Sequence, residues 1–337
     1  MPIVVVLVIA ACGGGGGGGA RAFQSATIAG GSTSGSANGP VATATFNNPT
    51  DVAADVDGSI YVCDFDNNLV RKIKNGVVTT LVSQANFAKP FGATISPTGQ
   101  LYVSTDDNAT GGHSGSTGTI WKVDKTTGVA TVLAHDIGRP RGLTCLLNGT
   151  IVAANLTRNV ISLFDPTTGA ETVIAGEDGV AGSNDGTGAA AHFSRPYGCC
   201  TLATNVILVA DQNNNKIRQV TQAGVVTTYA GTGAPGKNDA AYLNATFNGP
   251  QDVKLNPMTG DIFVADTKGL VIRRLQNGRV TTVAGNGIQG FVESDGTNNE
   301  YYGLEGISIS GDGTMLIIAD GNGGQGTNFN RIRSLQL

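Results

Sequence analysis

Apolar residues in this chain come in short runs separated by glycine, asparagine, aspartate or proline. Typical runs are IYVC from Ile60, ILVA from Ile207 and IFVA from Ile262. Runs of this length that are rich in β-branched residues and bounded by turn formers predict strands. No stretch shows the three-to-four-residue apolar period of an amphipathic helix. The pattern therefore predicts an all-β chain, in which most of the 50 glycines serve as turns.

One order of strands and turns recurs along the chain. Each copy opens with an aromatic or large apolar residue three positions before a proline. Next come a strand, a turn, a second strand ending in Asp or a related residue, a third strand such as VRKI and a fourth such as VTTVAG. Four antiparallel strands joined by tight turns predict one propeller blade per copy. The anchors of blades one to six are Phe46–Pro49, Phe87–Pro90, Ile137–Pro140, Phe193–Pro196, Phe247–Pro250 and the degenerate Tyr301–Leu304.

The sixth copy stops at Leu337, after its third strand. The missing fourth strand is present at the other end of the chain, as Ser25–Gly30. Supplying it from there would close the ring and leave no open sheet edge. The predicted fold is a six-bladed β-propeller of four-stranded antiparallel blades over residues 24–337, with the N-terminal strand completing blade six.

Position-specific chemistry supports this reading of the blade. A proline at the first residue of a strand removes no ladder hydrogen bond, and the preceding aromatic can fill the gap against the next blade. An Asp at the end of the second strand can accept turn amides. We expect the Arg or Lys of the third strand to reach that Asp.

The blade text F-x-x-P…G-x-I-Y-V-x-D-x-x-N…V-R-K-I…G-x-V-T-T-L-A-G resembles the NHL repeat. The resemblance extends from about Gln24 to Leu337. Blades one, four and five match it well, whereas blades two and three lack the Asp-Asn-Arg pattern. It implies the propeller fold. It leaves function open, because NHL propellers serve as sensors, adaptors, RNA binders and occasionally enzymes.

Residues 1–23 are expected to be a processing segment and tether outside the fold. Met1–Ala11 is apolar but too short to span a bilayer, and Ile9–Cys12 resembles a bacterial lipobox in which Cys12 is acylated. The alternative is an ordinary cleaved signal peptide with Cys12 incidental. Both readings predict export, and the first predicts a lipid anchor at the cell envelope or surface.

Charge excludes some partners. The formal net charge is −4, and no basic run suits a phosphate backbone, so we expect no nucleic-acid partner, and membrane contact only through the lipid. Enzyme motifs are also absent: there is no G-x-S-x-G, and no H-x-H spacing among the three histidines. We therefore assign no catalytic residue, no metal ligand and no cofactor.

Candidate ligand residues lie on one predicted face. Loops between the second and third strands and the linkers between blades emerge on the same side of a propeller, and here they are the long ones. We expect the site at the channel mouth on this face, built from Asp64, Asp106, His113, His135, Asn155, Asp211, Asp266 and Asp320. The alternative is that the linkers only cap the blade junctions and the Asp column is structural.

The leading functional hypothesis is a non-catalytic, surface-tethered monomer that binds a protein or glycan through this face. The alternative is a divalent-metal-dependent lyase or lactonase. Gluconolactonase-like propellers place a divalent cation among Glu, Asn and Asp side chains, which are hard oxygen ligands. The Asp and Asn residues expected at this channel mouth are similar, so a divalent cation is possible here.

Two of the cysteines suggest a disulfide. Cys145 and Cys200 fall in the first strand of adjacent blades with opposite parity, so they could meet across the junction of blades three and four. The alternative is that both are buried free thiols. Cys63 replaces an alanine and is expected in the core.

Overall fold

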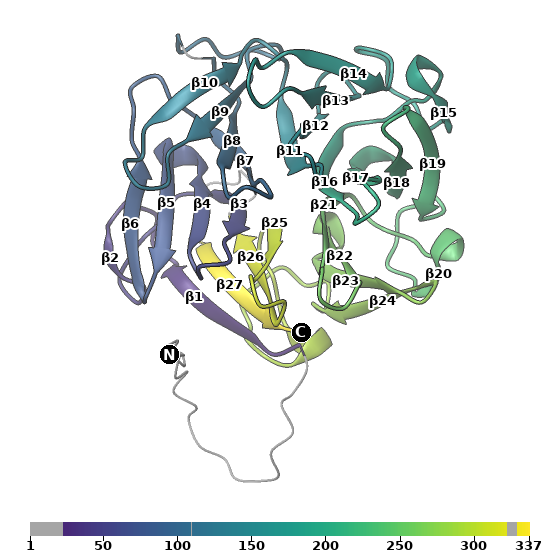
Figure 1. The fold of residues 1–337 in the computed structure, drawn as a ribbon. Coiled ribbons are helices and arrows are strands. Elements are labelled where there is room, and N and C mark those ends of the chain that lie inside the picture. Colours follow the sequence, from purple (N-terminus) through teal and green to yellow (C-terminus); the bar gives the residue numbers. More distant parts are fainter. Residues whose placement is uncertain (1–22, 109, 322–328) are drawn as a thin grey trace.

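Six antiparallel sheets surround a central channel in the computed structural model (Figure 1). The structure describes residues 23–108, 110–321 and 329–337. Its helices are single 3-10 turns, and within these ranges none is long and apolar enough to cross a membrane. Cys12 and the rest of the proposed leader lie outside the described residues.

Blades one to three follow the predicted order from the channel outwards. Blade one is β3 (Pro49–Ala54), β4 (Ile60–Asp64), β5 (Leu69–Lys74) and β6 (Val77–Val82), with η1 (Phe65–Asn67) and an outer strand β2 (Gly39–Pro40). Blade two is β7 (Pro90–Ile95), β8 (Leu101–Thr105), β9 (Thr119–Val123) and β10 (Ala130–Ala134). Blade three is β11 (Pro140–Cys145), β12 (Ile151–Asn155), β13 (Val160–Phe164) and β14 (Glu171–Ala175).

Blades four to six repeat this order. Blade four is β16 (Pro196–Thr201), β17 (Ile207–Asp211), β18 (Lys216–Val220) and β19 (Val225–Ala230), with β15 (Gly186–Thr187), η2 (Gly188–Ala190) and η3 (Gln212–Asn214). Blade five is β21 (Pro250–Leu255), β22 (Ile262–Asp266), β23 (Val271–Gln276) and β24 (Arg279–Ala284), with β20 (Ala240–Ala241), η4 (Tyr242–Asn244) and η5 (Thr267–Gly269). Blade six is β25 (Leu304–Ile309), β26 (Met315–Asp320), β27 (Asn330–Gln336) and β1 (Ser25–Gly31), preceded by η6 (Gly296–Asn298).

The predicted ring closure is confirmed. Strand β1 pairs antiparallel with β27, from Ser25 opposite Leu335 to Gly31 opposite Asn330. The outermost strand of the last blade therefore comes from the start of the described chain, and β1 and β27 lie side by side in the ribbon (Figure 1).

The anchors form the contacts between blades. Each anchor proline is the first residue of its innermost strand and pairs with the last residue of the second strand, as Pro49 does with Asp64. The preceding large side chains are at most 7% exposed in all six blades, and they pack in clusters that join neighbouring blades. The gap-filling role predicted for them is confirmed.

The long linkers follow the alternative that the sequence left open, in which they cap the blade junctions. In blades one, four and five a piece of the linker forms a fifth strand at the outer edge of the sheet, as β2, β15 and β20 pair with β6, β19 and β24. These linkers therefore descend along the outside of the ring and cap the junctions between blades. The length of these linkers is explained by this capping role, so it is no evidence that the linker side of the ring binds a ligand.

The disulfide prediction is wrong. Cys145 and Cys200 are both free and buried. Cys145 packs with residues of blades two and three, whereas Cys200 packs with residues of blades four and five. The parity argument put the two thiols on opposite faces of their strands but chose the wrong pair of faces, so they point away from each other. Cys63 is fully buried in the core, as predicted.

Candidate ligand-binding site at the channel mouth

Four of the predicted site residues belong to a buried clamp that holds each linker to its blade. In blade one, the Asp64 carboxylate accepts hydrogen bonds from Arg71 Nη1 (3.0 Å), Asn67 Nδ2 (2.8 Å) and the Asn47 amide (2.7 Å). Arg71 also donates to the linker carbonyl of Ala37 (2.9 Å). The third-strand arginine therefore reaches the Asp, as expected, and ties it to the linker.

The clamp recurs in blades four, five and six. Its Asp–Arg pairs, whose side chains are at most 1% exposed, are Asp211–Arg218 (2.8 Å), Asp266–Arg273 (3.3 Å) and Asp320–Arg333 (2.9 Å). Burial raises the pKa of Asp64 and Asp266 to about 6, which leaves both ionised at neutral pH. With their oxygens bonded to Arg and backbone amides, these carboxylates face the blade interior. Their role is structural, which is the alternative to ligand binding that the sequence left open for the Asp column.

Blade two replaces the clamp with an uncharged side-chain pair, and blade three replaces it with bonds from one side chain to the backbone. Thr105 takes the Asp position of blade two and accepts a hydrogen bond from Trp121 Nε1 (2.8 Å), which stands in the Arg position. In blade three, Asn155 takes the Asp position, where its Oδ1 accepts the Arg139 amide (3.1 Å) and its Nδ2 donates to the Ile137 carbonyl. Asn155 is 2% exposed and is a structural residue as well.

Two predicted residues come together at the mouth of the channel, between blades two and three. Asp106 accepts a hydrogen bond from Arg141 Nη2 (2.7 Å) and lies 4.0 Å from Arg139 Nε. Arg139 Nη2 donates to His113 Nε2 (2.9 Å), and His113 Nδ1 contacts Asp107. Burial raises the pKa of Asp106, and the neighbouring Arg141 acts in the opposite direction.

His135 does not join this group. It follows β10, the outermost strand of blade two, is exposed, and its Nδ1 contacts Asp136 (2.8 Å). Of the eight predicted ligand residues, the structure therefore brings only Asp106 and His113 into one cluster.

The inner wall of the channel is formed by the residue that follows each anchor. Below the mouth these side chains surround a constriction whose free volume is about 10 Å³, room for about one water. Arg141 stacks on Phe91, with the guanidinium carbon 3.6 Å from the ring centroid, and Tyr197 packs edge-on against Phe91. In chain order the six wall residues are Thr50, Phe91, Arg141, Tyr197, Gln251 and Glu305.

Several polar atoms in this wall have no hydrogen-bond partner among the described residues. Two nitrogens of Arg141, Nε and Nη1, and one oxygen of Gln251, Oε1, are buried and have no hydrogen-bond partner in the described part of the chain. The Arg141 side chain as a whole is 10% exposed. Burial also raises the pKa of Glu305, which is 8% exposed, to about 8. Donors and acceptors are thus presented to the same small space, where a ligand or water must satisfy them.

A charged group of Asp51, Asp252 and Lys254 lines the same constriction. Lys254 Nζ donates to both oxygens of Asp252 (2.7 and 2.9 Å), and Asp252 also accepts the Ile307 amide of the next blade (2.9 Å). Asp51 does the same for the Ala93 amide (2.9 Å). These carboxylates are saturated by protein donors and join neighbouring blades.

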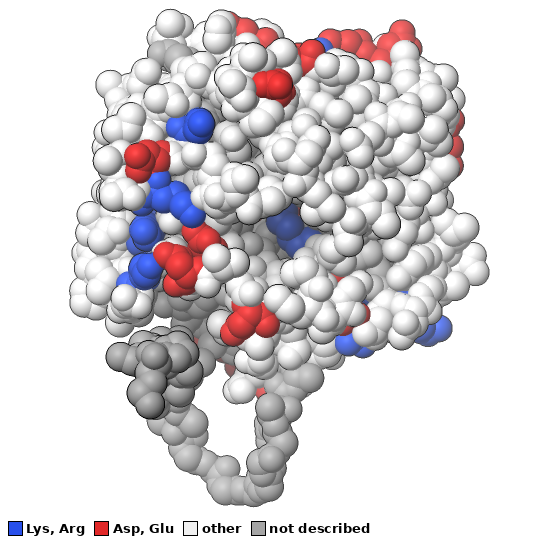
Figure 2. Space-filling view, in the orientation of Figure 1, with Lys and Arg blue, Asp and Glu red and all other residues white. Residues whose placement is uncertain are grey.

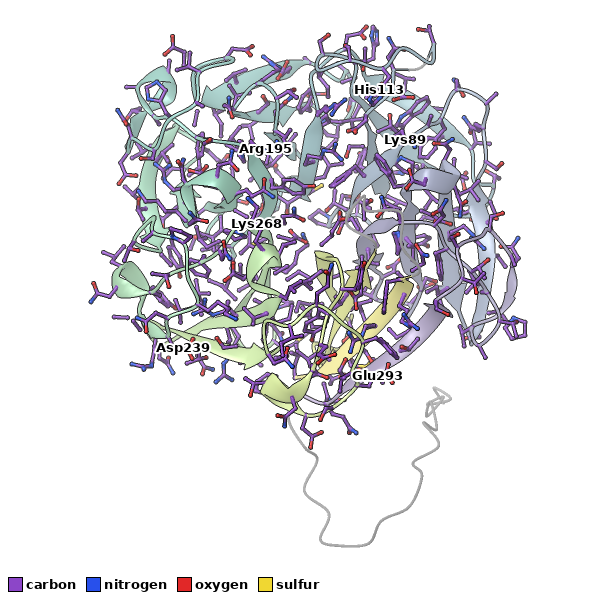
Figure 3. All side chains as sticks on the ribbon, turned by 180° about the vertical axis from the view of Figure 1, so that it is seen from behind. Lys89, His113, Arg195, Asp239, Lys268 and Glu293 are labelled. Atoms are coloured by element: carbon purple, nitrogen blue, oxygen red, sulfur yellow. The ribbon has the colours of Figure 1, made fainter. Side chains whose placement is uncertain are left out.

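The opposite end of the channel opens at the face that carries the hairpin turns, here called the hairpin face. A cavity of about 220 Å³ is lined there by aliphatic side chains, Thr94, Thr144, Ser308 and Lys254. The space-filling view shows a central hollow with basic atoms inside it (Figure 2). Figure 3 shows the other face, here called the linker face, with Lys89, Arg195 and Lys268 around its centre and His113 nearer the upper rim.

Sequence reasoning missed the wall residues. The signal was available: the position after each anchor is polar or aromatic in every blade, and in none is it an aliphatic residue. Among the described residues no three His, Cys, Asp or Glu side chains are grouped so that they could hold a metal ion.

Comparison with known proteins settles the family. A family model described as the teneurin NHL domain matches residues 26–323. The chain belongs to the NHL-repeat family. Among its NHL relatives, human NHL repeat-containing protein 2 is 36% identical over 99 residues, 29% of this chain and 13% of that protein. Mouse teneurin-3 is 27% identical over 252 residues, 70% of this chain and 8% of that protein. The NHL chain thus spans about a tenth of the length of these relatives.

Solved structures confirm the fold of this NHL propeller. A Bacteroides thetaiotaomicron protein of unknown function matches with a TM-score of 0.75 at 19% identity, covering 94% of this chain and 76% of that one. An auxiliary nutrient binding protein from Bacteroides ovatus gives 0.70 at 18%, with the same coverage. Virginiamycin B lyase from Staphylococcus aureus gives 0.55 at 16%, covering 86% of this chain and 95% of the lyase. At these identities the likeness concerns the fold.

Proposed function

We propose that this NHL propeller is a non-catalytic binding protein that recognises a protein or glycan at the channel mouth of the linker face. The observation that supports this most is the unsatisfied polar lining of the mouth. Arg141 presents two buried N–H groups and Gln251 one buried oxygen to the same opening, without partners among the described residues. Unpaired buried groups cost about 1–3 kcal/mol each, and a bound ligand would recover that energy.

Binding is favoured over the lyase or lactonase alternative by the state of the channel-mouth oxygens. Four of the predicted carboxylates are bonded to arginines, and Asp106 is bonded to Arg141. A hard cation needs several free oxygens, and these are already occupied. The auxiliary nutrient binding protein with this fold adds an analogy for a binding role.

As part of the same proposal, the protein is exported and held at the cell envelope through Cys12, and it acts as a monomer. Cys12 lies outside the described residues, so this rests on the lipobox-like sequence alone. Metabolic labelling with a fatty-acid analogue in a bacterial host, with Cys12→Ser as control, tests the anchor.

The binding role is tested by a glycan and peptide array probed with the labelled protein over residues 23–337. We expect discrete hits that are lost in Arg141→Gln and kept in Lys122→Gln, which changes an exposed lysine on β9 at a distance from the mouth. Mass spectrometry of each hit, with and without added divalent metal, should show the ligand unchanged. Metal-dependent products would establish the enzyme instead, and hits insensitive to Arg141→Gln would move the site elsewhere.

A further inference from the structure

Three consecutive blades place a basic residue directly before the anchor proline: Lys89, Arg139 and Arg195. Because the position is equivalent in each blade, the three side chains lie along one side of the channel mouth, and Arg141 lies inside them at the wall. We name these four residues the basic arc. Figure 3 shows Lys89 and Arg195 on the linker face, with Lys268 of blade five next along the ring.

The basic arc is only partly neutralised. Lys89 pairs with Asp66 (2.9 Å) and Arg141 with Asp106 (2.7 Å). Arg139 Nε lies 4.0 Å from the same Asp106 carboxylate, whereas Arg195 and the neighbouring Lys268 form no ion pair within the described part of the chain. The opposite side of the mouth contributes Glu305, which burial keeps largely protonated at neutral pH. A protein of formal net charge −4 thus places four basic side chains at one opening, where three of them share only two carboxylates, Asp66 and Asp106.

This arrangement selects the chemistry of a ligand. Arg141 Nη2 already donates to Asp106 (2.7 Å), so a ligand carboxylate can accept one further N–H of Arg141, whereas Gln251 Oε1 and the Glu305 carboxyl fit hydroxyl donors. The constriction of about 10 Å³ admits a group about the size of one water, such as a hydroxyl, so the carboxylate and the rest of the ligand stay at the mouth.

We propose that the channel mouth binds the carboxylate of an acidic sugar, a uronic acid at the end of an oligosaccharide. This rests on the proposed binding function and names its ligand class. A uronic acid carries a carboxylate beside ring hydroxyls, so one residue at the mouth can pair its carboxylate with the basic arc and place one hydroxyl in the constriction, near Gln251 and Glu305. An Asp or Glu side chain of an acidic peptide offers the carboxylate without adjacent hydroxyls. Stable peptide docking also uses a broad interface with large apolar anchors, which this opening does not supply.

The test is isothermal titration calorimetry of residues 23–337 with trigalacturonic acid. The fully methyl-esterified trisaccharide is the neutral control and a glutamate oligopeptide is the acidic control. We expect binding of the acid, with at least tenfold weaker binding of the ester and the peptide. Arg141→Gln should weaken the acid at least tenfold and Arg195→Gln a few-fold, whereas Lys122→Gln should leave it unchanged. Circular dichroism shows whether each variant is folded, and affinity should fall with added salt.

Each other outcome is decisive. If the ester binds as well as the acid and Arg141→Gln weakens both, the binding function stands and the acidic-sugar assignment is overturned. A preference for the peptide overturns it in favour of a protein ligand. Failure of the acid to bind at millimolar concentration also overturns it, while array hits lost in Arg141→Gln would still support the binding function.

Discussion

The clamp makes a quantitative prediction in blade four. Replacing Arg218 with Met keeps much of the apolar stem but removes the hydrogen bonds to Asp211 (2.8 Å) and to the linker carbonyls of His192 and Asn184 (3.0 Å each). Asp211 then stays buried as a charge without its cation, a change that typically costs about 3–5 kcal/mol. With unfolding entropy of about 2.1 cal/mol/K per residue, a chain of this length loses about 4–7 °C in Tm.

Equilibrium unfolding in urea measures this loss with two probes. Circular dichroism follows all blades, while the fluorescence of Trp121, the single tryptophan, follows blade two. If the ring unfolds as one unit, both probes report the same shift although the change is in blade four. Arg279→Met, at an exposed arginine of β24, is the matched control and should shift stability by no more than about 0.5 kcal/mol.

A double substitution separates the charge effect from lost packing. Asp211→Asn combined with Arg218→Met removes the stranded charge, so it should be more stable than Arg218→Met alone. The reasoning is refuted if Arg218→Met costs less than about 1 kcal/mol, or if the double variant is the less stable of the two.

Three further predictions follow from single positions. Burial raises the pKa of Glu305 from 4.5 to about 8, so the folded state holds this proton more tightly than the unfolded state, and the free energy of unfolding should fall as pH rises between about 4.5 and 8. Thermal melts at pH 5 to 9 measure this slope, and Glu305→Gln should flatten it. An unchanged slope in the variant contradicts the prediction. Gly30→Val should destabilise the closure by several kcal/mol, because φ is +87° and a Cβ would lie 2.2 Å from the Asn330 carbonyl, whereas Gly31→Val meets nothing within 4 Å and should be tolerated; equal melting temperatures would disprove the distinction. Thiol titration of the oxidised protein over residues 23–337 should find four reactive cysteines after denaturation and almost none before it, since all four are free and buried; a count of two would restore a disulfide.

The fold was predictable because each blade repeats the same local rules. Pro49 and its equivalents mark where a strand starts, Asp64 and its equivalents mark where the paired strand ends, and Ser25–Gly30 matches the strand missing from blade six. The strand ends can be read within one blade, and the closure followed from comparing the incomplete sixth copy with the complete ones. The arginine partner of the Asp was predictable for the same reason, since both residues belong to one hairpin.

The site was predicted less well because it depends on where side chains point after the ring has closed. Asp211 was expected at the channel mouth, but its side chain points into the blade, where it forms an ion pair with Arg218. Cys145 and Cys200 have the parity of a cross-blade pair, yet parity does not say which neighbour each strand faces. Arg141 was overlooked because it forms a site only together with Phe91, Glu305 and Gln251, which come from other blades and are distant in the sequence.

The uneven distribution of the clamp has an evolutionary consequence. Rigidity is supplied by blades one, four, five and six, whose Asp–Arg pairs hold their linkers, whereas blades two and three have given up those pairs and hold most of the polar cluster at the opening. Substitutions around Asp106, Arg139 and Arg141 can therefore accumulate without destabilising the ring, because the clamps lie in the other four blades. A scaffold divided in this way could exchange one ligand preference for another while its architecture stayed the same.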